Sequence, residues 1–170
     1  MSDLTVRKAR ADEYAAVGEL TVAAYAADGY FEDVSMDGYA EELAAAEDRA
    51  KDSDVLVAVD ESGTLLGTVT VIRPDSRGAE LVREGELEIR MLAVSPAARG
   101  RGVGAELTRA VLRMAAAEGC ARVVLCSVAD RVKVHALYER EGFRRIPERD
   151  WRPEPDLLLL GFAAELQSDE

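Results

Sequence analysis

The chain has very few of the residues that metal and redox sites usually need. Its 170 residues include one histidine and two cysteines, Cys120 and Cys126. The two cysteines flank and occupy one predicted strand, and neither belongs to a Cys/His spacing typical of a zinc site. The composition therefore predicts neither a disulfide framework nor a metal centre.

Long apolar runs are also missing. The longest, residues 157–160, has the length of a strand, whereas a membrane-spanning helix needs about 18 apolar residues. Residues 1–4 are not followed by the basic and apolar segments of a signal peptide. We therefore expect a cytoplasmic protein that does not bind membranes.

Positive charge is scarce. The chain has 21 Lys and Arg against 33 Asp and Glu, a net charge of −12. Such a chain is a poor candidate for binding nucleic acid. It is compatible with a cationic substrate, although acidity is also a common means of keeping a protein soluble.

What remains is the composition of a globular enzyme-sized domain. Hydrophobic residues make up 48% of the chain and charged residues 32%, and a chain of this length buries a sizeable core. We find no repeat, low-complexity tract or linker. We therefore expect a single domain over residues 1–170.

The order of predicted elements indicates the fold class. Asp12 is predicted to cap a first helix that carries Ala15, Ala16, Leu20 and Ala23. The other helices are expected at about 36–50, after residue 102 and around 134–138, and the strands around residues 4–6 and at 55–59, 65–72, 85–94, 123–128 and 157–162. A hairpin followed by alternating strands and helices predicts a mixed α/β sheet covered by helices.

A glycine-rich loop lies between the strand at 85–94 and the next helix. It reads Arg99, Gly100, Arg101, Gly102, Val103, Gly104. A helix N-terminus offers unpaired N–H groups to an anion, and glycines let the backbone approach it closely. The pattern favours a phosphate site, but a tight turn with solvated arginines would look the same.

Two other phosphate motifs fit this loop poorly. The P-loop needs Gly-Lys-Ser/Thr, which the chain does not contain. The dinucleotide fingerprint needs an acidic residue about 20 positions downstream, where this chain has Val123, Val124 and Leu125.

Two motifs together resemble the GNAT superfamily of acyl-CoA N-acyltransferases. The first is the family's Arg/Gln-x-x-Gly-x-Gly/Ala pattern at residues 99–104, after the strand end Leu92, Ala93, Val94. The second is aliphatic-Tyr-x-x-x-Gly-Phe at residues 137–143, in the family's order and spacing. The resemblance implies a GNAT fold with a mixed, mostly antiparallel twisted sheet of about six to seven strands and about four helices.

The resemblance also implies roles for individual residues. Leu92, Ala93 and Val94 would pair with the pantetheine arm of acetyl-CoA. The segment Arg99, Gly100, Arg101, Gly102, Val103 and Gly104 would hold its pyrophosphate. The family often has an asparagine seven residues before its tyrosine; here Arg131 occupies that position and would either bind a cofactor phosphate or face solvent.

Two residues are the implied catalytic groups. Tyr138 matches the family tyrosine that protonates the leaving thiolate, and Glu88 the glutamate that accepts the amine proton, directly or through water. Both have a plainer alternative. Tyr138 has the spacing of a core aromatic, and Glu88 can instead be a strand-face partner of Arg90.

The acceptor side is less clearly encoded. Tyr25, Tyr30 and Phe31 lie between the first two helices among acidic residues, and Trp151 precedes the last strand. These four would line a pocket for a small-molecule or peptide amine, or the first three would anchor an acidic loop. We expect an N-acetyltransferase, monomeric or homodimeric. The alternatives are a non-catalytic acyl-CoA sensor and a nucleotide-phosphate-binding protein.

Overall fold

The computed structural model describes residues 4–30 and 38–166. The chain divides into two compact units, one of residues 1–70 and 91–107 and the other of residues 71–90 and 108–170. Its strands follow the order β1-β2-β3-β4-β5-β8-β6, and β7 pairs with β8. This is the mixed, mostly antiparallel sheet with several helices that was expected. It has eight strands rather than six to seven. The additional strands are the short β6 and β7, which have no clear sequence pattern.

In the first unit, short helices pack against strands of the sheet. Its strands are β1 (Thr5–Lys8), β2 (Asp54–Val59) and the first part of β3 (Leu65–Ile72), and its helices are α1 (Tyr14–Ala27), α2 (Tyr39–Ala44) and α3 (Ala46–Arg49). β1 pairs antiparallel with β2. Val17 of α1 and Ala46 of α3 pack with the valines of β2 in one buried cluster.

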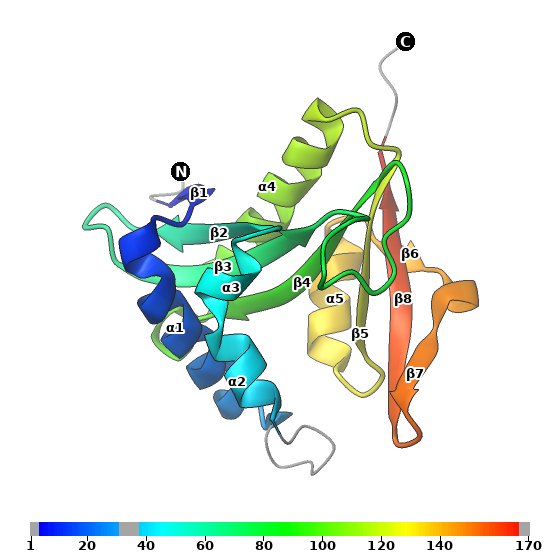
Figure 1. The fold of residues 1–170 in the computed structure, drawn as a ribbon, viewed down its shortest axis with the longest axis horizontal. Helices are drawn as coiled ribbons and strands as arrows, with labels where there is room; N and C mark the ends of the chain where they lie inside the picture. The colour runs from blue at the N-terminus through cyan, green and yellow to red at the C-terminus, as the bar shows by residue number, and fades with distance from the viewer. Residues whose placement is uncertain (1–3, 31–37, 167–170) are drawn as a thin grey trace. The chain divides into compact units, whose positions relative to one another are not determined.

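Helices α1 and α2 lie side by side in the lower left of Figure 1. Their contact depends on Gly18, because a Cβ atom there would lie 2.3 Å from the carbonyl oxygen of Ala44. No side chain fits at that distance. Instead of the single helix expected at 36–50, the described part of this segment forms two short helices, α2 and α3. Residues 36 and 37 lie outside the described residues.

Four residues form the buried face of α1, and the predicted cap lies outside the helix. Val17, Gly18, Thr21 and Ala24 are buried, while Ala15, Ala16 and Ala23 are not among its buried residues. Asp12 does not cap the helix; it lies in the 3-10 turn η1 (Ala11–Glu13). The predicted cap was therefore wrong, since Glu13 precedes the helix. A helix rich in alanine has no strong apolar face, so tertiary packing selects the face that is buried.

The second unit is built on a strand pair that runs in parallel. β4 (Glu86–Val94) enters it through residues 86–90 and pairs parallel with β5 (Arg122–Val128), with Glu88 opposite Val124 in the last registered pair. β5 pairs antiparallel with β8 (Leu157–Glu165) along its whole length. The predicted strand at 123–128 is confirmed, and Figure 1 shows β5 beside β8.

The remaining elements of the second unit surround β8. β6 (Arg144–Arg145) and β7 (Trp151–Glu154) both pair antiparallel with β8, and the turn η5 (Pro147–Arg149) lies between them. Helix α5 (Val132–Arg140) ends before Gly142, which has a φ of 100°. The predicted end of this helix at Gly142 is thus confirmed.

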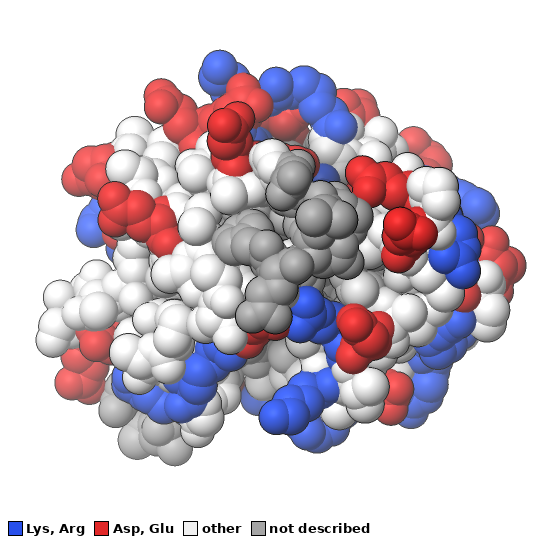
Figure 2. Space-filling view, turned by 90° about the horizontal axis from the view of Figure 1, so that it is seen from below, with Lys and Arg blue, Asp and Glu red and all other residues white. Residues whose placement is uncertain are grey.

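Charge of both signs is spread over the face of the molecule that Figure 2 draws. On the face drawn in Figure 2, acidic and basic side chains are intermixed rather than separated into blocks. The net charge of −12 therefore does not gather into one acidic patch on that face. Among the described residues, no helix is long and apolar enough to cross a membrane.

Candidate functional site

The glycine-rich loop belongs to the first unit. The 3-10 turn η4 (Pro96–Ala98) follows β4, and helix α4 (Val103–Ala117) begins directly after Gly102. Gly100 and Gly102 have φ values of 79° and 76°, a region that favours glycine. A Cβ atom at either position would meet nothing within 4 Å. No neighbouring atom crowds these two glycines, and the helix begins at the next residue.

The segment that leads into the loop is fixed to β3. The Ser95 amide donates to the Leu66 carbonyl at 2.8 Å, and the Ala98 amide donates to Ser95 at 2.8 Å. Gly67 lies close beneath, because a Cβ atom there would lie 2.9 Å from the Ala93 oxygen and 2.8 Å from Val103 Cγ1. Sequence reasoning missed Gly67, since an isolated glycine in a strand has no distinctive signal.

The two arginines of the loop differ. Arg99 Nε donates to the Val94 carbonyl at 3.1 Å, and its two terminal nitrogens contact Asp28 at 3.0 and 3.4 Å. Arg101 is exposed. Arg99 therefore joins the loop to the end of β4 and to the residue that follows α1, whereas Arg101 extends into solvent beside Gly100 and Gly102.

One backbone irregularity in β4 was not foreseen. Met91 has a φ of 53°, the only positive value at a non-glycine residue in the described part of the chain. Such a conformation is strained for an unbranched side chain and commonly marks a functional position. It immediately precedes Leu92, Ala93 and Val94, of which Ala93 is buried and the other two are partly exposed. A one-residue strain of this kind leaves no trace in the sequence.

Glu88, in the second unit, uses its two carboxylate oxygens differently. Oε1 accepts hydrogen bonds from the amides of Glu80, Leu81 and Val82 at 2.9, 3.0 and 3.2 Å. Oε2 is buried and has no hydrogen-bond partner among the described residues. The side chain is fully buried. Burial raises the pKa of Glu88 above its usual value; the Glu80 charge adds to this, and the three amides oppose it.

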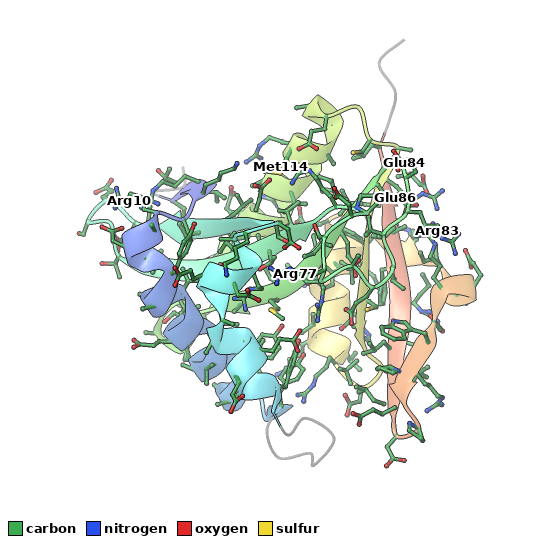
Figure 3. The ribbon with its side chains drawn as sticks, viewed as in Figure 1. Arg10, Arg77, Arg83, Glu84, Glu86 and Met114 are labelled. Carbon is green, nitrogen blue, oxygen red and sulfur yellow. The ribbon has the colours of Figure 1, made fainter. Side chains whose placement is uncertain are left out.

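The alternative pairing of Glu88 with Arg90 is not present. Arg90 Nε instead forms an ion pair with Glu80 at 2.9 Å, and its NH1 donates to the Gly78 carbonyl at 3.1 Å. Glu86 accepts the Arg83 amide at 2.9 Å. The side chains of Glu86, Glu88 and Arg90 on β4 therefore bind backbone groups of the β3–β4 connection, residues 73–85. Figure 3 labels Arg83, Glu84 and Glu86 at one end of this connection.

A buried ion pair secures the same strand. Arg149 makes two hydrogen bonds of 2.7 Å to the two oxygens of Glu86, and both side chains are 7% exposed. Burial tends to raise the pKa of Glu86, but Arg149, the Arg83 amide and Arg122 together lower it below its usual value. Glu86 is thus ionised and paired with Arg149, whereas Glu88 has a raised pKa and one oxygen without a hydrogen-bond partner among the described residues.

Cys126 and Trp151 lie close to Glu88. Both pack in one apolar cluster with Leu81 and Val124, and the Cys126 thiol contacts Glu80 Oε1 at 3.6 Å. Burial raises the pKa of the thiol, and the charges of Glu80 and Glu88 add to this effect. The raised pKa keeps the thiol protonated, which makes it a poor nucleophile.

Three side chains of this region, those of Glu80, Glu88 and Cys126, carry possible metal-ligand atoms that lie within 4.8 Å of one another. Arg90 already neutralises Glu80 at 2.9 Å, and the thiol resists the deprotonation that metal binding needs. The chemistry of this donor set suits a proton-handling cluster better than a metal centre.

Tyr138 and His135 lie on α5. Tyr138 is 5% exposed, and its ring lies 5.5 Å from that of Phe143, centroid to centroid. His135 Nε2 is 3.0 Å from the Val128 carbonyl, and its ring packs on Phe162. His135 thus has structural contacts, and Tyr138 is held in place by packing. Arg131 lies at the start of α5 with its Nε 3.7 Å from Asp130.

The predicted acceptor residues are divided between the units. In the first unit, the Tyr25 ring lies 4.6 Å from Tyr30 and 6.0 Å from Tyr39, centroid to centroid. Phe31 lies outside the described residues. In the second unit, Trp151 adjoins Cys126 and the residues that bind Glu88, and Asp150 forms an ion pair with Arg145.

In the first unit, a glycine turn opens a helix and a strained residue lies in the strand before it, an arrangement suited to binding an anionic ligand. The chain belongs to the acetyltransferase (GNAT) family, whose model matches residues 20–143. It is 38% identical over 104 residues to mycothiol acetyltransferase of Saccharopolyspora erythraea, a match that covers 61% of this chain and 31% of that protein. The chain thus spans only about a third of the length of the mycothiol acetyltransferases that it matches.

Solved structures share the fold. The PaiA N-acetyltransferase of Thermoplasma acidophilum, determined in complex with coenzyme A, has a TM-score of 0.74 at 14% identity and covers 98% of this chain and 100% of its own. A GNAT-family acetyltransferase of Staphylococcus aureus has a TM-score of 0.73 at 15% identity, with coverages of 96% and 99%. At these identities the likeness concerns the fold alone.

Proposed function

We propose that the protein transfers an acetyl group from acetyl-CoA to a primary amine in a direct, ternary-complex reaction. The observation that carries the proposal is Glu88. One of its oxygens is fixed by three amides, and the other is buried and without a partner among the described residues. A fixed carboxylate with a raised pKa is suited to accept a proton near neutral pH.

The cofactor would be held by the glycine turn. Gly100 and Gly102 have open space on their Cα atoms and precede α4, which has 15 residues. A helix of this length presents free N–H groups and partial positive charge at its start. The thioester of acetyl-CoA supplies the activated acetyl group. Leu92, Ala93 and Val94 are the proposed strand partners of its pantetheine arm.

The residues of the chain would handle two protons. Glu88 Oε2 accepts one from the attacking amine, because only a neutral amine is nucleophilic. The Tyr138 hydroxyl donates one to the departing thiolate, whose conjugate acid has a pKa of about 8.5. No covalent enzyme intermediate is needed, in agreement with the raised pKa of the Cys126 thiol.

The names of relatives support acetylation of nitrogen. They include mycothiol acetyltransferases and, at 34% identity over 67 residues, the N-acetylaspartate synthetase of Danio rerio. These names do not identify the acceptor of this chain. They favour an enzyme over a non-catalytic acyl-CoA sensor of the same fold.

Release of free thiol is the test. The protein is incubated with acetyl-CoA and a panel of amines, and thiol is measured with a chromogenic disulfide. Amine-dependent release is expected. Binding of acetyl-CoA without release from any amine would indicate the sensor. Thermal shifts with acetyl-CoA, ATP and NAD test the loop separately, because a ligand of the folded state raises its stability.

A further inference from the structure

The C-terminal end of α5 is a Schellman motif built around Tyr138. The Phe143 amide donates to the Tyr138 carbonyl at 3.0 Å, and the Gly142 amide donates to the Glu139 carbonyl at 3.1 Å. Gly142, with its φ of 100°, supplies the left-handed residue that the motif needs. The contact between the Tyr138 and Phe143 rings is the apolar contact that often accompanies it. This turn therefore fixes both the backbone and the ring of Tyr138.

Glu141 is the residue that joins α5 to this turn. Its amide donates to the Tyr138 carbonyl at 3.0 Å. Its side chain is acidic, although a helix C-terminus carries partial negative charge and is stabilised by basic residues. The stability of the helix alone therefore does not account for a glutamate at this position.

Arg109 of α4 binds the Glu141 carboxylate through two nitrogens. Its Nε donates to Oε1 at 2.8 Å, and its NH2 donates to Oε2 at 3.0 Å. The Glu141 side chain is 10% exposed and that of Arg109 51%. A two-point contact of this kind fixes orientation as well as distance. One residue of α4 therefore holds the turn in which Tyr138 is fixed.

We propose that Arg109 and Glu141 are positioning residues for the reaction: their ion pair fixes the last turn of α5 and thereby the place of the Tyr138 hydroxyl. The inference rests on the proposed function, in which this hydroxyl protonates the departing thiolate. Tyrosine has only two side-chain torsions, so its hydroxyl follows the backbone that carries the ring. Proton transfer needs hydrogen-bond distance, and a misplacement of about 1 Å can cost about 10²-fold in rate.

Two variants break the pair from opposite sides. Glu141→Met and Arg109→Met are each expected to lower kcat about 3- to 30-fold, short of the loss that a full 1 Å misplacement can cause, while the Kd of acetyl-CoA changes little. Glu141→Met also removes an unfavourable charge from the helix end, so its Tm should stay within about 4 °C of the wild-type value. The double variant should lose no more than either single one, because all three lack the same contact.

The matched control is Glu118→Met. Glu118 follows α4 and accepts two hydrogen bonds from Arg73, at 3.3 and 2.6 Å. The control therefore removes the same kind of ion pair from the other end of the same helix, away from α5, and should keep the wild-type kcat. A loss of kcat as large as that of Glu141→Met would overturn the inference.

A second set of variants separates positioning from a general structural effect. In a Tyr138→Phe background, Arg109→Met should cause no further loss of kcat, because the hydroxyl to be positioned is already absent. If Arg109→Met lowers kcat by the same factor in both backgrounds, the pair acts on the whole fold and the inference is overturned. It is also overturned if Tyr138→Phe alone leaves a chemistry-limited kcat unchanged.

Amide hydrogen exchange measures the turn without turnover. The amides of Gly142 and Phe143 should exchange about threefold faster or more in Arg109→Met, because their hydrogen bonds open more often when Glu141 is released. Unchanged exchange at both amides would show that the pair does not hold the turn. Failure of the proposed function is distinguishable from both results, since wild-type protein would then release no thiol with any amine.

Discussion

At the scale of single residues, two glutamates on one strand have pKa values that are shifted in opposite directions. Glu86 is held ionised by Arg149, while burial raises the pKa of Glu88. The two side chains are two positions apart and both are buried. The difference comes from the partner: a guanidinium stabilises the carboxylate fully, whereas three neutral amides compensate only part of the cost of burial.

Replacing Glu88 with glutamine should remove the proton acceptor and keep its shape. The rate is expected to fall by about 10²–10⁴-fold, the usual contribution of a general base. The acidic limb of the wild-type kcat/KM profile should lie above the usual glutamate range, because the pKa of Glu88 is raised, and it should vanish in the variant.

Glu86→Gln is the matched control for this experiment. It makes the same chemical change on the same strand face, but it breaks the pair with Arg149. It should lower Tm and leave the acidic limb in place. A Glu88→Gln enzyme within about threefold of the wild-type rate at neutral pH, far below the effect of a lost base, would show that Glu88 only holds residues 80–82.

Tyr138→Phe should separate catalysis from binding. The ring keeps its contact with Phe143, and only the hydroxyl is lost. We expect kcat to fall about 10²-fold, the low end for a lost proton donor, while the Kd of acetyl-CoA changes little. Calorimetry and steady-state kinetics measure the two quantities. Equal kcat values, with chemistry shown to limit the rate, would leave Tyr138 a packing residue.

At the scale of elements, the loop before α4 is the part that should bind the cofactor. Gly102→Glu would place a side chain and a negative charge at the helix N-terminus, where an anion is expected. Binding of coenzyme A, measured by calorimetry, should be lost while the far-ultraviolet circular dichroism stays that of the folded protein.

Gly63→Glu is the control for that substitution. Gly63 lies in the turn between β2 and β3 and has a φ of 81°, and a Cβ atom added there, as at Gly102, would meet nothing within 4 Å. The control therefore carries the same backbone strain and the same added charge away from the loop. Unchanged coenzyme A affinity in folded Gly102→Glu would remove the pyrophosphate assignment.

The sequence predicts elements well where one pattern dominates. The strands at 65–72 and 123–128 and the end of α5 at Gly142 follow directly from apolar runs and a glycine. The buried face of α1 does not, because alanine is acceptable both in a core and in solvent. The strain at Met91 and the amides on Glu88 depend on contacts that no local pattern records.

At the scale of the whole molecule, acid should weaken the fold through its paired carboxylates. The hydrogen bond from Arg7 is the main cause that lowers the pKa of Glu13 to about 2, and Arg149 helps to lower that of Glu86. A lowered folded-state pKa gives stability that is present above the unfolded-state value and lost as pH falls through the folded one.

The free energy of unfolding, measured with urea, should therefore decline from about pH 4.5, an ordinary glutamate pKa, toward the pKa of Glu13, about 2. Arg149→Met should cost about 3–5 kcal/mol at pH 7, because it leaves Glu86 buried and unpaired. Adding Glu86→Leu to it should restore most of the loss. A single variant as stable as wild type at pH 7 would contradict this account of the pair.

The hydrogen bonds between Glu88 and residues 80–82 determine which substitutions this segment should tolerate. Glu88 accepts hydrogen bonds there only from main-chain N–H groups, so its position does not depend on which side chain stands at Val82. Proline is the exception, because it has no N–H to donate. A library randomised at residue 82 should therefore lack proline and retain active clones of many other residue types, apart from those that disturb the packing of residue 82 against Leu81 and Val124.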